Sequence, residues 1–293
     1  MGSLIYDLYH DEMRAGFLVT TDRKKIWNVE LNLLVEVDRI CQNHGITYFA
    51  DYGTLLGAVR HQGFIPWDDD IDLVMLRPDY ERFKEIAMNE IKTPLFFQNT
   101  YTDTFVCAFS KIRDSRTTAV EFPEDYQMNQ GIFVDIFPLD DVEDGSRRQT
   151  NIYQIEKELW MTIVQPADIQ KAIESGNRTQ IHPEVLQSLL ALSCRERMNE
   201  FENFCHRHSD SSKNVNFLTD DLCGISASVP RSCYTSAVRL PFETIMLPVP
   251  EDYSTVLQRR YGEYMKYVVG DSLHEGIVLS ADIPYKEYLS KVT

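Results

Sequence analysis

Positively charged residues are scarce in this chain. Its 293 residues include 29 Lys and Arg against 45 Asp and Glu, which gives a formal net charge of −16 at pH 7. General nucleic-acid binders neutralise phosphates with clustered Lys and Arg, so we expect no nucleic-acid partner. No stretch approaches the ~20 consecutive apolar residues that a membrane-spanning helix needs, and Met1–Met13 lacks a signal-peptide pattern. We therefore expect neither a transmembrane segment nor export.

Cysteine is sparse, and its spacing fits no usual metal or redox motif. Six cysteines are scattered along the chain without a CxxC pair, so reduced thiols are the simplest interpretation. A zinc site built from Cys205, Cys223 and Cys233 with neighbouring histidines is an alternative, but this spacing matches no common zinc pattern. We favour cysteines without metal.

The composition is otherwise that of a globular protein. Hydrophobic residues make up 43% and charged residues 25% of the chain, which predicts one large domain or a domain with an appendage. Helices are expected at 22–44, 54–60, from 77 onward, and at 147–165, 183–208 and 251–261. Strands are expected at 46–50, along the acidic run from Asp68 through its apolar tail to Met75, at 105–112, at 131–137 and within 236–247. These elements predict an α/β (α+β) fold, in which helices flank a mixed sheet and a mainly helical insertion precedes a C-terminal α/β segment.

The most unusual segment is Asp68-Asp69-Asp70-Ile71-Asp72, which runs into the apolar Leu73–Met75. In an extended chain, side chains two apart share a face. Asp68, Asp70 and Asp72 are therefore expected on one face, with Asp69 pointing away. Carboxylates this close raise each other's pKa unless a cation lies between them. The run predicts a divalent metal site, for which Mg²⁺ or Mn²⁺ is the preferred ion.

Asp135 and Gly53-Thr54 extend this candidate site. Asp135 is the one carboxylate in the apolar strand pattern Gly131–Phe137, so it is either a third ligand or a buried acid with another partner. Gly53-Thr54 lies at an expected strand-to-helix turn, where backbone N–H groups can face a phosphate. A solvated loop and a calcium-binding turn are alternatives for the acidic run, but its apolar continuation and the lack of EF-hand spacing disfavour them. These residues favour metal-assisted phosphoryl transfer.

Several segments resemble motifs of the LicD family. They are Tyr52–His61, Gly63–Asp72, Lys111–Thr117 and Gly131–Asp140, and the likeness resumes at Leu240–Glu243 and Pro250–Met265. Members of this family are phosphorylcholine transferases of bacterial surface polysaccharides, related to the fukutin-type sugar-phosphate transferases and sharing the nucleotidyltransferase fold. The resemblance implies a nucleotidyltransferase-like core at 1–145. It leaves a helical region at 146–222 as a candidate acceptor site and a segment at 223–293 that packs back on the core.

The resemblance also assigns roles to residues. It implies that Asp70 and Asp72 are paired metal ligands, that Asp135 is the third acid, and that Gly53-Thr54 faces the donor phosphates. Asp135 can act as a general base or only as a ligand. The implied donor is CDP-choline: phosphocholine moves to a hydroxyl of a cell-surface glycan, such as a lipopolysaccharide or teichoic acid precursor, and CMP leaves. Another CDP-linked donor carrying ribitol, glycerol or a sugar phosphate is an alternative, as is a catalytically silent nucleotide-binding scaffold.

Cations near these acids are the expected ligands of the donor phosphates. They are Lys111, Arg113 and Arg60, and an ordinary ion pair is the alternative for each. His274 lies where family members often carry a histidine, but the segment around it departs from the family pattern. The resemblance implies a bacterial cytoplasmic protein, with contact to the inner face of the membrane through a lipid-linked acceptor as a further option.

Overall fold

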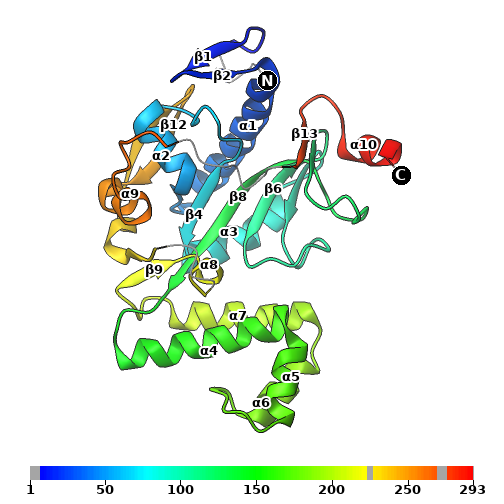
Figure 1. Ribbon diagram of the computed structural model, residues 1–293, viewed down its shortest axis with the longest axis vertical. Helices are drawn as coiled ribbons and strands as arrows, with labels where there is room; N and C mark the ends of the chain where they lie inside the picture. The colour runs from blue at the N-terminus through cyan, green and yellow to red at the C-terminus, as the bar shows by residue number, and fades with distance from the viewer. Residues whose placement is uncertain (1–6, 223–226, 269–275, 293) are drawn as a thin grey trace. The chain divides into compact units, whose positions relative to one another are not determined.

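The computed structural model describes residues 7–222, 227–268 and 276–292, and it contains two compact units (Figure 1). One unit comprises Met1–Phe137 and Cys233–Thr293, and the other comprises Pro138–Ser232. The mixed α/β fold expected from the sequence is confirmed. The second unit begins inside a strand, at Pro138.

A mixed sheet with the strand order β3–β4–β8–β6–β5 forms the centre of the first unit. Its strands are β3 (Phe49–Ala50), β4 (Asp72–Leu76), β5 (Leu95–Gln98), β6 (Ser110–Asp114) and β8 (Ile132–Asp141). The apolar residues of β4 and of the first half of β8 are buried on both faces of the sheet, which explains their nearly continuous apolar sequence. These two central strands carry Asp72 and Asp135.

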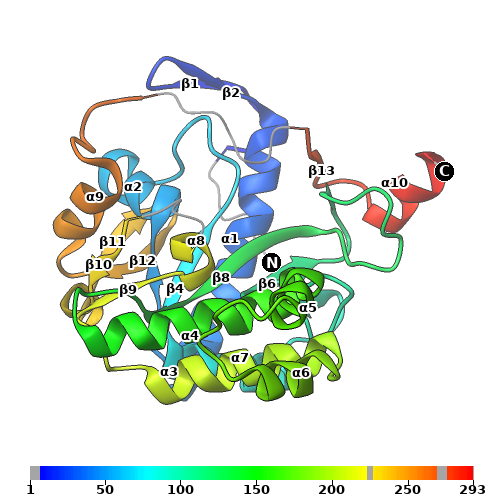
Figure 2. The same cartoon turned by 60° about the horizontal axis from the view of Figure 1, so that its bottom comes forward.

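Two helices, α1 (Thr21–His44) and α3 (Arg77–Glu90), lie on one face of this sheet (Figures 1 and 2). α1 begins where the Thr20 hydroxyl accepts a hydrogen bond from the Arg23 N–H at 3.3 Å, and it ends at Gly45, whose φ of 61° is left-handed. Its apolar face, which includes Trp27 and Leu34, is fully buried. The period of apolar residues therefore predicted this helix correctly.

The other elements of the first unit surround the sheet. α2 (Tyr52–His61) contacts both β4 and α9 (Tyr253–Tyr261). Two hairpins are formed by β1 (Glu12–Arg14) with β2 (Phe17–Val19) and by β11 (Ala237–Phe242) with β12 (Ile245–Pro250). β13 (Val278–Ser280) pairs with β7 (Thr118–Val120), and α10 (Tyr285–Val292) follows.

The second unit is mainly helical. Its two longest helices, α4 (Arg147–Val164) and α7 (Cys194–His208), run side by side (Figures 1 and 2). The shorter elements are α5 (Pro166–Glu174), α6 (Pro183–Leu190), β9 (Asn214–Asn216), α8 (Leu218–Leu222) and β10 (Val229–Pro230), and the short helix η1 (Arg231–Tyr234) spans the end of the unit. In the part of the chain that the structure describes, no helix combines the length and apolarity needed to cross a membrane.

Two expected elements differ from those observed. The single helix expected at 183–208 is two helices, because Ser193 and Glu196 form a capping box that starts α7. The strand expected at 105–112 begins only at Ser110. The Thr100 hydroxyl bonds both the N–H and the carbonyl of Cys107, at 3.0 and 2.9 Å, and so removes these groups from the ladder.

Candidate active site

The acidic run lies in a loop between α2 and β4. Only Asp72 belongs to the strand; Asp68–Ile71, here called the acid loop, follows a turn in which the Asp68 N–H donates to the Ile65 carbonyl at 2.9 Å. Strand alternation therefore does not govern this loop, and the expectation that Asp69 points away is wrong. Asp68, Asp69 and Asp70 each offer a carboxylate oxygen, and these oxygens lie within 4.8 Å of one another.

Asp72 and Asp135 lie on the neighbouring strands β4 and β8. The Asp135 N–H donates to the Ile71 carbonyl at 2.9 Å, which joins β8 to the end of the acid loop. Burial, and then the charges of Asp70 and Asp135, raise the pKa of Asp72 well above its ordinary value. Asp72 is therefore close enough to both Asp70 and Asp135 to feel their charges. Among the described residues, however, Asp72 and Asp135 do not belong to the group of oxygens within 4.8 Å.

The acids of this site fit a divalent cation. Burial and the neighbouring Asp70 raise the pKa of Asp68 to about 8. Glu30 on α1 is also buried, and burial together with the charges of the acid loop raises its pKa well above the ordinary value. Crowded carboxylates are stable together when a cation neutralises them, and their hard oxygens suit Mg²⁺ or Mn²⁺. The residues present thus agree with the predicted metal.

Residues outside the acid loop hold its backbone and make room for its side chains. The Asp68 carbonyl accepts hydrogen bonds from the Trp27 indole at 3.0 Å and from the Arg23 guanidinium at 2.6 Å. At Gly53, a Cβ atom would lie 2.4 Å from the Asp68 Oδ2 atom. A side chain at this position would therefore displace the end of the Asp68 carboxylate.

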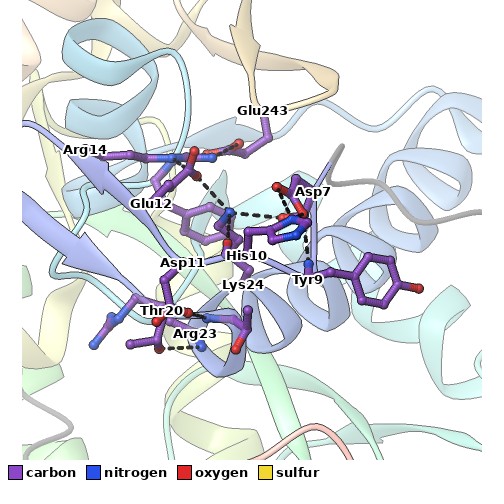
Figure 3. A network of polar contacts seen from close by, with 12 residues as sticks. Asp7, Tyr9, His10, Asp11, Glu12, Arg14, Thr20, Arg23, Lys24 and Glu243 are labelled. Atoms are coloured by element: carbon purple, nitrogen blue, oxygen red, sulfur yellow. Dashed lines mark hydrogen bonds and ion pairs between the residues drawn. The ribbon is translucent and has the colours of Figure 1, made fainter.

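A polar network joins residues at the start of the chain to Lys24 on α1 and to Glu243 (Figure 3). The buried Lys24 ammonium donates to the carbonyls of Asp7 and His10 at 3.0 and 2.8 Å. Arg14 forms an ion pair with Glu243, and the same Glu243 carboxylate accepts the Phe64 N–H at 3.2 Å. The hairpin is thus tied to the chain four residues before Asp68.

The Gly53-Thr54 turn opens α2 and is bonded to β4. The Thr54 hydroxyl accepts the Asp72 N–H at 2.8 Å, and the Asp51 N–H donates to the Asp72 carbonyl at 3.1 Å. Thr54 is almost fully buried. The Thr54 hydroxyl therefore links α2 to β4. Its contact with the donor phosphates stays a prediction.

Lys111 lies beside Asp135 rather than on the surface. Its ammonium is 3.2 Å from Asp135 Oδ1, 3.1 Å from Glu121 Oε1 and 3.5 Å from the centre of the Phe133 ring. Burial raises the pKa of Asp135, and the nearby Lys111 charge offsets part of this rise. Asp135, the one carboxylate within Gly131–Phe137, therefore has a cation partner.

Arg113 and Arg60 are committed to protein partners. Arg113 is fully buried, where it donates to Gln98 at 2.6 Å and the Gly131 carbonyl at 2.8 Å and pairs with Glu121. The Arg60 guanidinium donates to the carbonyls of Tyr264 and Lys266 at 3.1 and 3.2 Å. Contact of either residue with a donor phosphate stays a prediction.

A cavity of about 570 Å³ opens beside the acid loop and the turn. Gly53 and Asp68 line one side of it. Its other walls are formed by Leu56, Arg60, Ile65, Trp67, Tyr261, Glu263, Tyr264, Lys266 and Val268. A space of this size, next to the Gly53-Thr54 turn and the crowded acids, is large enough for part of a nucleotide-sized ligand.

Sequence reasoning missed Glu121 and Asp51. Glu121 pairs with both Lys111 and Arg113, and its position after the apolar Thr118–Val120 was an available signal. Asp51 precedes α2 as its N-cap, where an acid is a common helix start. Cys223 and His274 lie outside the described residues. Within the described residues, Asp68, Asp69 and Asp70 of the acid loop form the one group of three side chains that could hold a metal ion.

Residues 45–168 match the family described as LicD/FKTN/FKRP, nucleotidyltransferase domain. The lipopolysaccharide cholinephosphotransferase LicD of Haemophilus influenzae is 26% identical over 241 residues, which cover 80% of this chain and 88% of that relative. Two shorter matches are uncharacterised proteins: RP689 of Rickettsia prowazekii, 38% identical over 27% of each chain, and RT0683 of Rickettsia typhi, 43% identical over 18% of each. The resemblance to the LicD family is thereby confirmed.

Proposed function

We propose that this chain, which carries a LicD/FKTN/FKRP nucleotidyltransferase domain at residues 45–168, is a metal-dependent phosphorylcholine transferase. Its donor is CDP-choline, and its acceptor is a hydroxyl of a surface glycan or lipid-linked glycan precursor. The similarity to a lipopolysaccharide cholinephosphotransferase over 80% of the chain supports a lipopolysaccharide acceptor, with a teichoic acid precursor as the alternative. The proposed location of the protein is the bacterial cytosol or the inner face of the bacterial membrane.

The proposal is supported by three features of the site that lie next to one another. The acid loop gathers Asp68, Asp69 and Asp70 within 4.8 Å. Gly53 at the start of α2 packs against this loop, and the cavity of about 570 Å³ opens beside both. A metal site, a turn of backbone N–H groups and a space for the donor are the parts that transfer from a nucleotide pyrophosphate requires.

Asp70 and Asp72, with Asp135, are the proposed ligands of Mg²⁺ or Mn²⁺. When bound, the ion polarises the phosphorus and stabilises the leaving oxygen. The acceptor oxygen forms a bond to the phosphorus that bears choline, the bond from that phosphorus to the bridging oxygen breaks, and CMP leaves with this oxygen. The proton of the acceptor hydroxyl goes to a carboxylate base, for which Asp135, held by Lys111 at 3.2 Å, is the candidate.

The test is CMP release by the full chain from CDP-choline with Mg²⁺ and a lipopolysaccharide acceptor. Asp72→Asn should lower the rate by about 10³-fold or more, because it removes a metal ligand. Asp22→Asn is the matched control, since its side chain is 85% exposed on α1. Equal rates in the wild type and Asp72→Asn would contradict the metal assignment.

Binding measurements distinguish CDP-choline from the alternative donors. A ligand that binds the folded state raises the melting temperature, so CDP-choline, CDP-ribitol, CDP-glycerol and nucleotide sugars can be compared at equal concentration. CDP-choline should give the largest increase. Turnover of another donor alone would contradict the choline assignment, and calorimetry that finds neither metal nor nucleotide binding would favour the silent scaffold.

A further inference from the structure

A buried ion pair from the C-terminal segment anchors the start of α2. Asp51, which precedes α2, is fully buried, and the Arg260 side chain on α9 is 3% exposed. Arg260 Nε donates to Asp51 Oδ1 at 2.8 Å, and Arg260 Nη2 donates to Asp51 Oδ2 at 2.9 Å. This two-pronged geometry fixes the direction as well as the position of the carboxylate.

The Asp51 carboxylate has two further donors. The Tyr234 hydroxyl donates to Oδ2 at 2.5 Å, and the Tyr52 N–H donates to Oδ1 at 2.7 Å. The backbone of Asp51 is held as well, because its N–H donates to the Asp72 carbonyl at 3.1 Å. Asp51 therefore joins α9, the start of α2 and the strand that carries Asp72.

The residue after Asp51 has an unusual backbone. Tyr52 has a φ of 47°, a left-handed conformation that a bulky residue adopts only when its surroundings enforce it. The Arg260 guanidinium lies 4.1 Å from the centre of the Tyr52 ring, so the same arginine holds Tyr52 on one side and Asp51 on the other. This strained residue leads directly into Gly53, which packs against Asp68.

We propose that Arg260 is a positioning residue: acting through Asp51 and Tyr52, it holds the Gly53-Thr54 turn in the conformation that binds pyrophosphate. This inference rests on the proposed function only in taking the turn as a phosphate site. Arg260 itself does not contact the donor, because Asp51 occupies its guanidinium. When the two hydrogen bonds from the Arg260 guanidinium to Asp51 are lost, the Gly53-Thr54 turn loses its alignment, even if a positive charge remains at position 260.

The test compares Arg260→Lys with Arg259→Lys, which makes the same change at an exposed position of the same helix. Binding of Mn²⁺ alone, and of inorganic pyrophosphate in the presence of Mn²⁺, is measured by calorimetry on the full chain. Arg260→Lys should weaken pyrophosphate binding about tenfold, because lysine cannot replace the fork. It should change Mn²⁺ affinity by less than about twofold, since the acid loop has its own supports. Arg259→Lys should change neither.

Other outcomes overturn the inference. If Arg260→Lys only lowers the melting temperature and keeps pyrophosphate affinity, the ion pair is merely structural. If it weakens Mn²⁺ binding as much as pyrophosphate binding, Arg260 supports the whole site rather than the turn. Should Arg260→Lys fail to fold, Tyr234→Phe removes one donor to Asp51, and it should weaken pyrophosphate binding about threefold with Mn²⁺ binding kept.

Binding measurements on the wild-type protein distinguish a failure of this inference from a failure of the proposed function. A wild-type chain that binds pyrophosphate but not CDP-choline would contradict the choline proposal, while the comparison of variants would still test Arg260. A wild-type chain that binds Mn²⁺ but no pyrophosphate would overturn the role of the turn and of Arg260 together.

Discussion

Asp68 allows a direct test of the charge repulsion in the acid loop. The pKa of Asp68 rises from 3.8 to about 8 because its carboxyl group is partly removed from water and lies near Asp70. A carboxyl group with a raised pKa binds more protons in the folded than in the unfolded state. Its contribution to stability is therefore fully present below about pH 4 and is lost as the pH rises through about 8. We expect the free energy of unfolding of the metal-free protein to fall across this window, and Asp68→Asn to remove this part of the fall.

The magnitude follows from the shift of the Asp68 pKa. Between pH 5 and pH 8, a slope of about 1.36 kcal/mol per pH unit gives roughly 4 kcal/mol. Asp68 is only partly buried, so water screens part of the repulsion, and its neighbours share the titration. We therefore expect a loss of about 2 kcal/mol that depends on Asp68.

Urea unfolding in EDTA at pH 5 and pH 8 measures this loss for the wild type, Asp68→Asn and the exposed control Asp22→Asn. The wild type and Asp22→Asn should lose about 2 kcal/mol more than Asp68→Asn between the two pH values. Mg²⁺ at about 100 times its dissociation constant should add roughly 2.7 kcal/mol to the wild type at pH 8. If the free energy of unfolding depends on pH equally in the wild type and Asp68→Asn, the raised pKa of Asp68 is contradicted.

Three further substitutions test single contacts of the site. Gly53→Ala places a Cβ 2.4 Å from Asp68 Oδ2, and should lower CMP release by about 10²-fold in a folded protein, because a small displacement of aligned groups is costly in rate. Thr54→Val leaves the Asp72 N–H without its acceptor and should lower the unfolding free energy by about 1–3 kcal/mol, whereas Thr54→Ser should keep it. Lys111→Met leaves the buried Asp135 and the half-buried Glu121 without this cation and should cost about 3–5 kcal/mol in urea unfolding; a cost near zero would show that the ion pairs contribute little.

Local patterns were sufficient to predict much of the fold. The apolar period of α1 and the Gly45 stop locate a helix that the structure confirms. The apolar runs of β4 and β8 are central strands buried on both faces. The capping box at Ser193 was visible in the sequence, but the continuous helical period across 183–208 concealed it.

The candidate site was less predictable, because its geometry depends on contacts between distant segments. Strand alternation placed Asp69 away from its neighbours, whereas a turn from Ile65 keeps the acid loop out of the strand. Arg113 was predicted as a phosphate ligand with an ion pair as the alternative; the structure shows its ion pair with Glu121, a partner that no local pattern indicated. Arg260 lies 209 residues from Asp51, and no local pattern relates two residues so far apart.

The central claim is transfer of phosphocholine by a metal site at the acid loop. Its most direct measurement is the mass of a lipopolysaccharide acceptor after incubation with the full chain, CDP-choline and Mg²⁺. We expect the acceptor to gain one phosphocholine for each CMP released, and EDTA or Asp70→Asn to abolish both changes. CMP release without modified acceptor, or modification that continues in EDTA, would contradict it.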